Sequence, residues 1–280
     1  MTNEITLVLG GTGKTGRRIV ERLEQRGVPT RAAARSTGFD WHDPTSWDAV
    51  LDNVKAAYIN YAPDLAVPGA TEAIRLFAQK AVEAGVQRLV LLSGRGEDEA
   101  QRCEKIVQDA GVDWTIVRAS WFQQNFSEGE FVELVLAGAV TLPAGDVQEP
   151  FIDIDDIADV AVAALTEAGH TGEVYEVTGP RLMTFAEAVQ EIAHASGRDV
   201  AYVQIPHDAF VAGIAASGAP SEMAWLLDYL FTSVLDGRNA YLTDGVQRAL
   251  GREPTDFAEY ARRTAATGVW DAAPRQMAAG

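Results

Sequence analysis

The chain of 280 residues carries 23 Lys and Arg against 40 Asp and Glu, a formal net charge of -17, and 47% of its residues are hydrophobic. This composition is that of a globular protein, and the negative charge argues against nucleic acid and anionic membrane as partners of its surface. A single cysteine, Cys103, excludes an intrachain disulfide, and no apolar run approaches the roughly 18 residues of a membrane span. We therefore expect a cytoplasmic protein with a small-molecule partner, no nucleic acid and no membrane; a homo-oligomer is compatible with the sequence.

Apolar runs and helical patterns alternate through the first 120 residues. Strands are predicted at 5–9, 30–34, 56–61, 88–92 and 114–117, and helices at 14–25, 46–51, 69–84 and 98–110. Short buried strands separated by amphipathic helices are typical of a parallel sheet with helices on both faces. Right-handed crossovers then give a doubly wound α/β fold.

The pattern changes after Arg118. Residues 120–147 are irregular and rich in aromatic side chains, which predicts an insertion over the sheet. A strand at 150–154, a helix at 155–165 and a strand at 173–178 resume the alternation. Helical segments near 184–195, 207–216, 220–236 and 256–265 follow, with one strand at 200–203. We predict a sheet domain at 1–120, with 150–178 returning to it, and a smaller, mainly helical part at 121–149 and 179–280.

Seven residues, Gly10-Gly11-Thr12-Gly13-Lys14-Thr15-Gly16, join the first predicted strand to the first predicted helix. In a turn of this kind Gly10 permits the sharp bend, Gly13 permits close contact with a phosphate, and Gly16 lets the helix pack on the strand. A glycine pattern alone is a weak signal, and a purely structural turn is the alternative. Its place between strand and helix predicts a pyrophosphate bound at the positive helix end.

The end of the second predicted strand bears on the choice of cofactor. Sites that prefer NAD usually carry Asp or Glu there, about 20 residues beyond the glycines, for the ribose 2'-hydroxyl. This chain has Arg35 and Ser36, which suit a 2'-phosphate, so we expect NADP(H) to be preferred over NAD(H). Residues 1–35 also hold seven basic side chains against three acidic ones. We expect Lys14, Arg17, Arg18 and Arg35 to surround the cofactor phosphates, with a solvated strand end as the alternative for Arg35.

The glycine turn and the segments 39–44, 114–126, 151–160 and 175–180 together resemble the NmrA-like group of atypical short-chain dehydrogenases/reductases. Within that group the pattern is most similar to the branch of fungal ergot-alkaloid reductases and bacterial NAD(P)H:quinone reductases. The resemblance implies a Rossmann sheet and a set of cofactor contacts. It implies that the pyrophosphate is held by Gly10, Thr12, Gly13, Lys14 and Thr15, and that the adenosine phosphate faces Arg35 and Ser36. It further implies that Asp40 and Trp41 border the adenine, and that the rest of the cofactor lies along Tyr61, Ala62 and Pro63. Core packing is the alternative role for Trp41.

No catalytic pair of the ordinary kind is present. Short-chain dehydrogenases use a Tyr four residues before a Lys, the lysine lowering the pKa of the phenol that transfers the proton. None of the four lysines has a tyrosine at that spacing. Ser93 matches the position of the hydroxyl in the larger family, with a turn cap as the alternative. Gln123 and Asn125 are further candidates, because amides in an aromatic stretch need partners when buried.

The aromatic residues after the fifth strand are candidates for the substrate. We predict a substrate pocket formed by Phe122, Phe126 and Phe151, with Trp225, Tyr229 and Phe231 as a lid; ordinary core packing is the alternative for these rings. No metal site is expected. The carboxylates near 153–159 most simply cap and charge the next helix: Asp153, Asp155, Asp156 and Asp159.

These observations predict an NADPH-dependent reductase that transfers hydride to a hydrophobic cyclic or aromatic small molecule. A quinone, an iminium or an activated alkene accepts hydride with less help from an acid than an alkyl ketone does, which fits the missing Tyr–Lys pair. Two alternatives remain at this point. One is a non-catalytic, NADP(H)-sensing regulatory protein, and the other is an isomerase or cyclase on the same fold.

Overall fold

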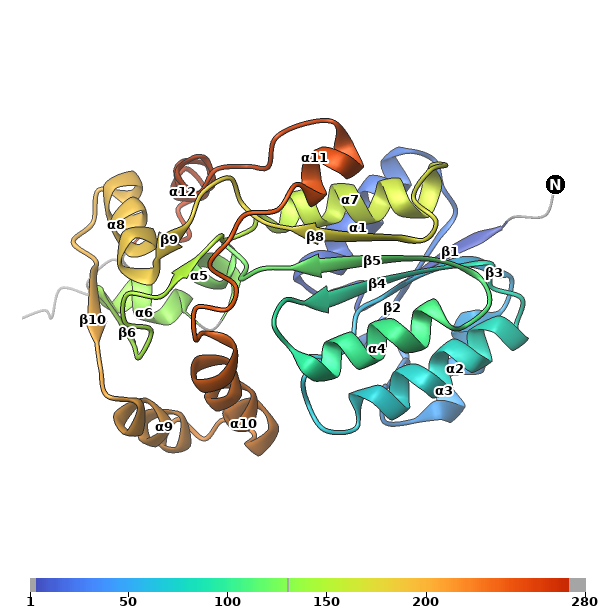
Figure 1. The fold of residues 1–280 in the computed structure, drawn as a ribbon, viewed down its shortest axis with the longest axis horizontal. Coiled ribbons are helices and arrows are strands. Elements are labelled where there is room, and N and C mark those ends of the chain that lie inside the picture. Colours follow the sequence, from blue (N-terminus) through green and yellow to red (C-terminus); the bar gives the residue numbers. More distant parts are fainter. Residues whose placement is uncertain (1–3, 130, 272–280) are drawn as a thin grey trace, which may run out of the picture.

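The main sheet is parallel, and the loops that leave its first and third strands lie side by side at its carboxyl edge. The computed structural model describes residues 4–129 and 131–271. Six parallel strands lie in the order β2-β1-β3-β4-β5-β8 (Figure 1): β1 (Ile5–Leu9), β2 (Thr30–Ala33), β3 (Val54–Ile59), β4 (Arg88–Gly94), β5 (Asp113–Ala119) and β8 (Glu173–Val177). The chain order reverses between β1 and β3, so the loops leaving these strands border a crevice. The predicted doubly wound α/β sheet is confirmed.

Helices cover both faces of this sheet (Figure 1). One face carries α2 (Trp47–Leu51), α3 (Ala70–Glu83) and α4 (Asp98–Gln108), and the other carries α1 (Lys14–Gln25), α7 (Ile154–Thr166) and α11 (Gly245–Leu250). Side chains alternate along each strand, so Leu7 and Leu9 pack in the core beside α3 while Val8 packs in the core beside α1. Burial on both faces is the reason that these strands are continuous apolar runs.

The remaining elements are two short turns after β2 and a group after β5 that supplies an aromatic core. They are η1 (Arg35–Thr37) and η2 (Pro44–Ser46) after β2, and then α5 (Asn125–Glu128), α6 (Val132–Ala137), β6 (Ala139–Leu142), β7 (Gln148–Glu149), β9 (Met183–Thr184), α8 (Phe185–Ser196), β10 (Ala201–Gln204), α9 (His207–Ala216), α10 (Ser221–Tyr229), the π-helical turn η3 (Leu230–Val234) and α12 (Phe257–Ala265). Strand β6 pairs in parallel with β10, and β7 pairs antiparallel with β9. Phe126, Phe151, Phe185 and Phe257 meet in one buried cluster.

The structure differs from the predicted elements in several places, and α11, β7 and β9 were not predicted at all. The predicted strand at 150–154 is wrong, because only an isolated bridge joins Ile152 to Phe122 and the carboxylate of Asp153 starts α7 by accepting from the amide of Asp155. The stretch 120–147 contains α5, α6 and β6, whose short lengths leave no clear periodicity. The predicted helix at 220–236 is α10 followed by a π-turn.

Two further expectations concern the chain as a whole. The predicted division into a domain at 1–120 with 150–178 and a part at 121–149 and 179–280 stays a prediction, and its ends, 1–3 and 272–280, lie outside the described residues. Within the ranges that the structure describes, no helix combines the length and the apolar character that crossing a bilayer requires.

Candidate active site

The turn between β1 and α1 packs closely at Gly10, Gly11 and Gly16, where a side chain would have no room. Gly10 has a positive φ of 67°, and its carbonyl accepts a hydrogen bond of 2.8 Å from the amide of Gly13. A Cβ on Gly16 would collide with the carbonyl oxygen of Gly10, and one on Gly11 would lie 2.7 Å from the Cβ of Ala32. Helix α1 has no side-chain cap and no acidic residue in its first turn. Its positive end is therefore open to an anion, and the turn fits a dinucleotide pyrophosphate.

A cavity of about 670 Å³ opens beside this turn. Its size is within the range of small-molecule and cofactor sites. Most of the predicted cofactor residues line it: Gly10, Thr12, Gly13, Arg35, Ser36, Asp40, Trp41, Ala62 and Pro63. Arg35 and Ser36 begin the 3-10 turn after β2, and both are exposed there. A guanidinium and a hydroxyl thus stand at one edge of a cavity that begins at the end of β1.

Three of the predicted cofactor residues do not line the larger cavity. The Nζ of Lys14 donates to Oδ1 of Asn125 at 3.2 Å, which links the glycine turn to the aromatic segment. Thr15 is buried, and its hydroxyl accepts from the amide of Asn60 at 3.4 Å. Tyr61 borders a neighbouring cavity instead. These side chains connect the loops after β1, β3 and β5.

Trp41 combines the two roles that the sequence left open. Its ring is 8% exposed and packs in the core against Phe39, Tyr61 and Phe77, with ring centres 5.0 to 5.4 Å apart. The indole nitrogen donates to the carbonyl of Asn60 at 3.2 Å. The remaining edge of the ring forms part of the larger cavity. Trp41 therefore holds the loop after β3 in place and forms a wall of the cavity.

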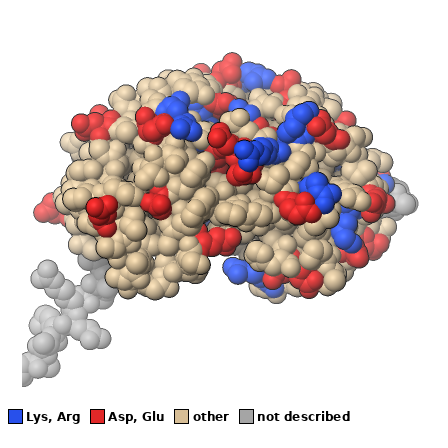
Figure 2. Space-filling view, turned by 60° about the horizontal axis from the view of Figure 1, so that its bottom comes forward, with Lys and Arg blue, Asp and Glu red and all other residues tan. Residues whose placement is uncertain are grey.

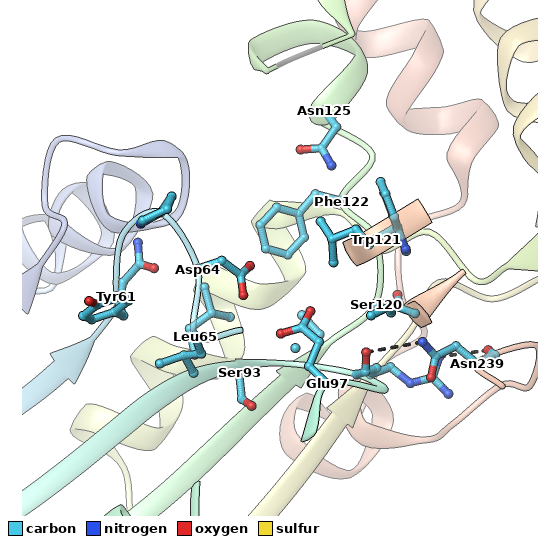
Figure 3. Close-up of a pocket in the computed structure, with 18 residues that line it drawn as sticks. Tyr61, Asp64, Leu65, Ser93, Glu97, Ser120, Trp121, Phe122, Asn125 and Asn239 are labelled. Carbon is cyan, nitrogen blue, oxygen red and sulfur yellow. Dashed lines mark hydrogen bonds between the residues drawn. The ribbon is translucent and has the colours of Figure 1, made fainter. Parts of the chain in front are cut away.

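A second cavity, of about 170 Å³, adjoins the first above the ends of β3, β4 and β5. Asn60 and Pro63 line both. Of the candidate residues, Tyr61, Ser93, Phe122 and Asn125 lie here (Figure 3). Residues that the sequence did not single out complete its wall, chiefly Asn60, Asp64, Leu65, Arg95, Glu97, Trp121, Leu230, Val234 and Asn239. They come from four separate loops, so no local pattern joins them.

The Ser93 hydroxyl forms a hydrogen bond below this cavity and does not point into it. It donates to Oε1 of Glu104 at 2.6 Å, and Figure 3 shows the side chain directed away from the other labelled groups. Glu104 in turn accepts from Arg118 at 2.5 Å and 2.8 Å. This buried network ties α4 to the ends of β4 and β5. Ser93 remains a candidate by position, while its only proton is committed to a carboxylate.

Gln123, Phe126 and Phe151 lie behind the cavity wall. The amide nitrogen of Gln123 donates to the carbonyls of Phe151 at 3.0 Å and Thr255 at 3.3 Å, and the side chain is fully buried. Phe126 and Phe151 pack in the aromatic core, and none of these three residues borders either of the two cavities. Phe122, by contrast, reaches the smaller cavity and packs against the sheet core beside α1.

The predicted lid is divided among three environments. Trp225 is 41% exposed and stacks on Tyr229 with ring centres 5.3 Å apart, whereas Phe231 lies in the aromatic core. The same segment meets both cavities through other side chains. Leu230 and Val234 line the smaller cavity, and Pro220, Glu222 and Met223 line the larger one.

The arginines of α1 do not surround the larger cavity, contrary to our expectation from the sequence. Arg17 pairs with Glu128, and Arg18 pairs with Glu128 at 2.6 Å and with Asp155 at 3.2 Å. These carboxylates come from α5 and α7, far from the glycine turn in sequence. Over the face in Figure 2, basic side chains likewise lie beside acidic ones. Most of the positive charge near the N-terminus is therefore neutralised within the protein, and Arg35 is the cation that lines the cavity.

The aspartates that begin α7 confirm the predicted capping role and add another. The carboxylate of Asp153 accepts from the amide of Asp155 at 2.9 Å, and its second oxygen accepts from Arg263 at 2.5 Å. Asp156 accepts from Arg252 at 2.6 Å. Two arginines from the C-terminal part are thus anchored on buried carboxylates of this helix. Within residues 4–129 and 131–271, no cluster of metal-binding side chains is found.

The glycine turn, the parallel sheet and the two joined cavities define the class: a Rossmann-type, dinucleotide-binding α/β protein. Residues 1–261 match the NmrA-like family, and the chain belongs to it.

Relatives agree with this assignment. The chain is similar to the uncharacterized oxidoreductase YesF of Bacillus subtilis, at 31% identity over 94% of this chain and 97% of the relative. It is also similar to agroclavine dehydrogenase of Claviceps fusiformis, at 29% identity over 91% and 95%. The solved structure of the NADPH-dependent quinone oxidoreductase QOR2 of Escherichia coli, complexed with NADPH, shares the fold: the TM-score is 0.74 at 22% identity, covering 92% of this chain and 99% of that one. The chain is an oxidoreductase, as the sequence predicted.

Proposed function

We propose that the chain is a reductase that uses NADP(H) in preference to NAD(H) and transfers hydride to a hydrophobic cyclic or aromatic small molecule. The acceptor classes are those predicted from the sequence: a quinone, an iminium or an activated alkene. The observation that carries the proposal is the junction of two cavities at Asn60 and Pro63. One cavity begins at the glycine turn, and the other is walled by Trp121 and Phe122. The similarity to agroclavine dehydrogenase supports a redox reaction on a small molecule.

The chain's own residues account for cofactor binding. The amides of the glycine turn and the first turn of α1 hold the pyrophosphate, and Arg35 with Ser36 receives the 2'-phosphate at the cavity edge. The bound reduced nicotinamide supplies the hydride. Asn60 and Pro63, which line both cavities, orient the ring toward the acceptor, and the apolar walls keep water away from it.

Cofactor preference is tested by titrating NADPH and NADH into the protein and into Arg35→Ala. Charged hydrogen bonds contribute about 1.5–3 kcal/mol, so the variant loses roughly 10- to 100-fold in NADPH affinity. NADH affinity changes less than about twofold, because NADH lacks the phosphate. Arg75→Ala is the matched control, since Arg75 is an exposed arginine of α3 that pairs only with the neighbouring Glu72 in the described contacts. Tighter binding of NADH by the unaltered protein would contradict the proposal.

The reaction is tested by following oxidation of NADPH with a panel of quinones, iminium salts and enones. We expect turnover with at least one of these classes. Binding of NADPH without turnover of any acceptor would instead identify a sensor. Product formation without NADPH oxidation would identify an isomerase or cyclase.

A further inference from the structure

Two carboxyl groups face each other inside the smaller cavity. Asp64 lies in the loop after β3 and Glu97 in the loop after β4, and both line the cavity. In Figure 3 their carboxyl groups point toward each other across the space. Two ionised carboxylates that face each other repel, so this arrangement favours a proton on the pair.

The Glu97 side chain does not cap the helix that it precedes, and the absence of a side chain at Gly94 lets it reach the cavity. It occupies the N-cap position of α4, where Ser, Thr, Asp or Asn is usual, yet its side chain makes no capping hydrogen bond. The carboxyl folds back over the end of β4 instead, into the space that a side chain on Gly94 would fill. Helix formation therefore does not explain this side chain.

The Glu97 carboxyl is also incompletely satisfied. The residue is 6% exposed, and its Oε2 has no hydrogen-bond partner within the described part of the chain. A buried polar oxygen without a partner costs stability and is expected where a ligand completes its hydrogen bonding. Here the unpartnered oxygen belongs to a residue that lines a cavity of about 170 Å³.

The charged groups around Glu97 favour its neutral form. Burial raises its pKa well above the ordinary value, and the nearby carboxylates of Asp64 and Glu104 raise it further. Burial also raises the pKa of Asp64. On α10, burial and the nearby carboxylates of Glu97 and Asp98 raise the pKa of the Tyr229 hydroxyl, which contributes no cation. Arg95 lines the same cavity, but its guanidinium is directed to Glu176 at 2.8 Å and to two backbone carbonyls.

We propose that Glu97, which faces Asp64 at the wall of the acceptor cavity, is the proton donor of this reductase. The inference rests on the proposed function and makes it more specific. A quinone or a conjugated carbonyl compound needs one proton on oxygen in addition to the hydride, whereas an iminium needs none. The carboxyl pair therefore points to a carbonyl-type acceptor.

The proton balance is simple. Hydride from the reduced dinucleotide brings both electrons and leaves negative charge on the acceptor oxygen. The O–H bond of Glu97 breaks, its electron pair stays on the carboxylate, and the proton forms the new O–H bond of the product. Glu97 is then a carboxylate. Asp64, the less buried of the two, relays a proton from water that restores the Glu97 carboxyl.

The first experiment detects the proton without any turnover. Infrared spectra of the full-length protein without cofactor are recorded at neutral and alkaline pH for the unaltered chain, Glu97→Gln and Asp64→Asn. We expect protonated-carboxyl absorption at neutral pH from which Glu97→Gln removes one component, and Asp64→Asn shifts that same component. The control is Glu99→Gln, two residues further on in the first turn of α4, whose carboxylate accepts from Thr71 and pairs with Arg102; it leaves this absorption unchanged. Identical spectra of the protein and Glu97→Gln would overturn the proposal.

The second experiment separates proton transfer from hydride transfer. General acids contribute about 10²- to 10⁴-fold, so Glu97→Gln loses at least about 100-fold in kcat/KM with a quinone. With an iminium salt it loses less than about threefold, and its affinity for NADP+ stays within about twofold, showing that the site is assembled. The quinone rate of the unaltered protein falls as pH rises through the upper macroscopic pKa of the pair, and this limb disappears in Glu97→Gln.

Other outcomes separate failure of this inference from failure of the proposed function. If the unaltered protein reduces quinones and Glu97→Gln does so equally well, the donor role is wrong and the reductase stands. Equal losses with quinone and iminium would likewise assign Glu97 a structural role. If the unaltered protein shows no NADPH oxidation with any acceptor of the panel, the proposed function fails, and the donor role fails with it.

Discussion

Glu149, at the end of β7, provides a test of the energetics of this fold. Its side chain is 0% exposed, and neither carboxylate oxygen has a partner in the ranges that the structure describes. Burial raises the pKa of Glu149 from 4.5 to about 7, with a smaller lowering by Arg95 and a raising by Asp236. The folded protein thus holds this proton more tightly than the unfolded chain does.

The sign and size of the effect follow from that difference. Below pH 4.5 Glu149 is protonated in both the folded and the unfolded state, and burying the neutral carboxyl costs less free energy than burying the carboxylate. As pH rises from 4.5 to about 7, the unfolded chain releases the proton first, so the free energy of unfolding falls. At 1.36 kcal/mol per unit of pKa, the loss amounts to roughly 3 kcal/mol.

Glu149→Gln keeps the shape of the side chain and removes its ionisation. We expect its free energy of unfolding to match that of the unaltered protein near pH 4 and to exceed it by roughly 3 kcal/mol near pH 8. Urea unfolding at intervals of one pH unit measures the difference, in which shared titrations cancel. Glu133→Gln, an exposed glutamate on α6, is the matched control for loss of one carboxylate. A difference between Glu149→Gln and the unaltered protein that stays constant across this range would refute the reasoning.

Three further predictions concern the glycine turn, the ion pairs and the aromatic core. Gly16→Ala places a methyl group against the backbone of the turn, so the protein loses about 1–3 kcal/mol of stability in urea unfolding and at least about tenfold in NADPH affinity. The control Gly213→Ala, in open space on α9, stabilises the protein. Arg18→Ala breaks two ion pairs and lowers stability by about 1–3 kcal/mol, with NADPH affinity within about twofold; a selective loss of affinity would instead return Arg18 to the phosphate site. Phe126→Ala lowers stability by about 3–5 kcal/mol because the ring is fully buried, while Phe122→Ala chiefly raises KM for the acceptor; the reverse pattern would exchange their roles.

Local patterns carried the prediction of the sheet and the cofactor loop. The turn at 10–16 and helix α1 follow from glycine chemistry and helical periodicity, both of which lie within a few residues. Gln123 and Asn125 show the limit of that approach. They are two residues apart in an irregular segment, yet one faces the core and the other a cavity, and only the backbone path after β5 decides between these directions.

Contacts between distant residues were beyond the sequence. From the sequence we expected Arg18 to contact a phosphate, because it follows the glycine turn. In the structure its partners are Glu128 and Asp155, which lie more than 100 residues away along the chain. Asp64 and Glu97 form no motif either. They meet because β3 and β4 are neighbours in the sheet, so their following loops share one edge.

The buried aspartates of α7 set a rule for exchanging parts between relatives. Asp153 and Asp156 are 0% and 1% exposed, and their arginine partners, Arg263 and Arg252, come from the far end of the chain. A chimera that keeps residues 1–178 and takes its remainder from another family member inherits both carboxylates. Unless the donor segment supplies cations at the same two places, each orphaned charge costs about 3–5 kcal/mol. Segments of this family are therefore interchangeable only together with their counter-charges.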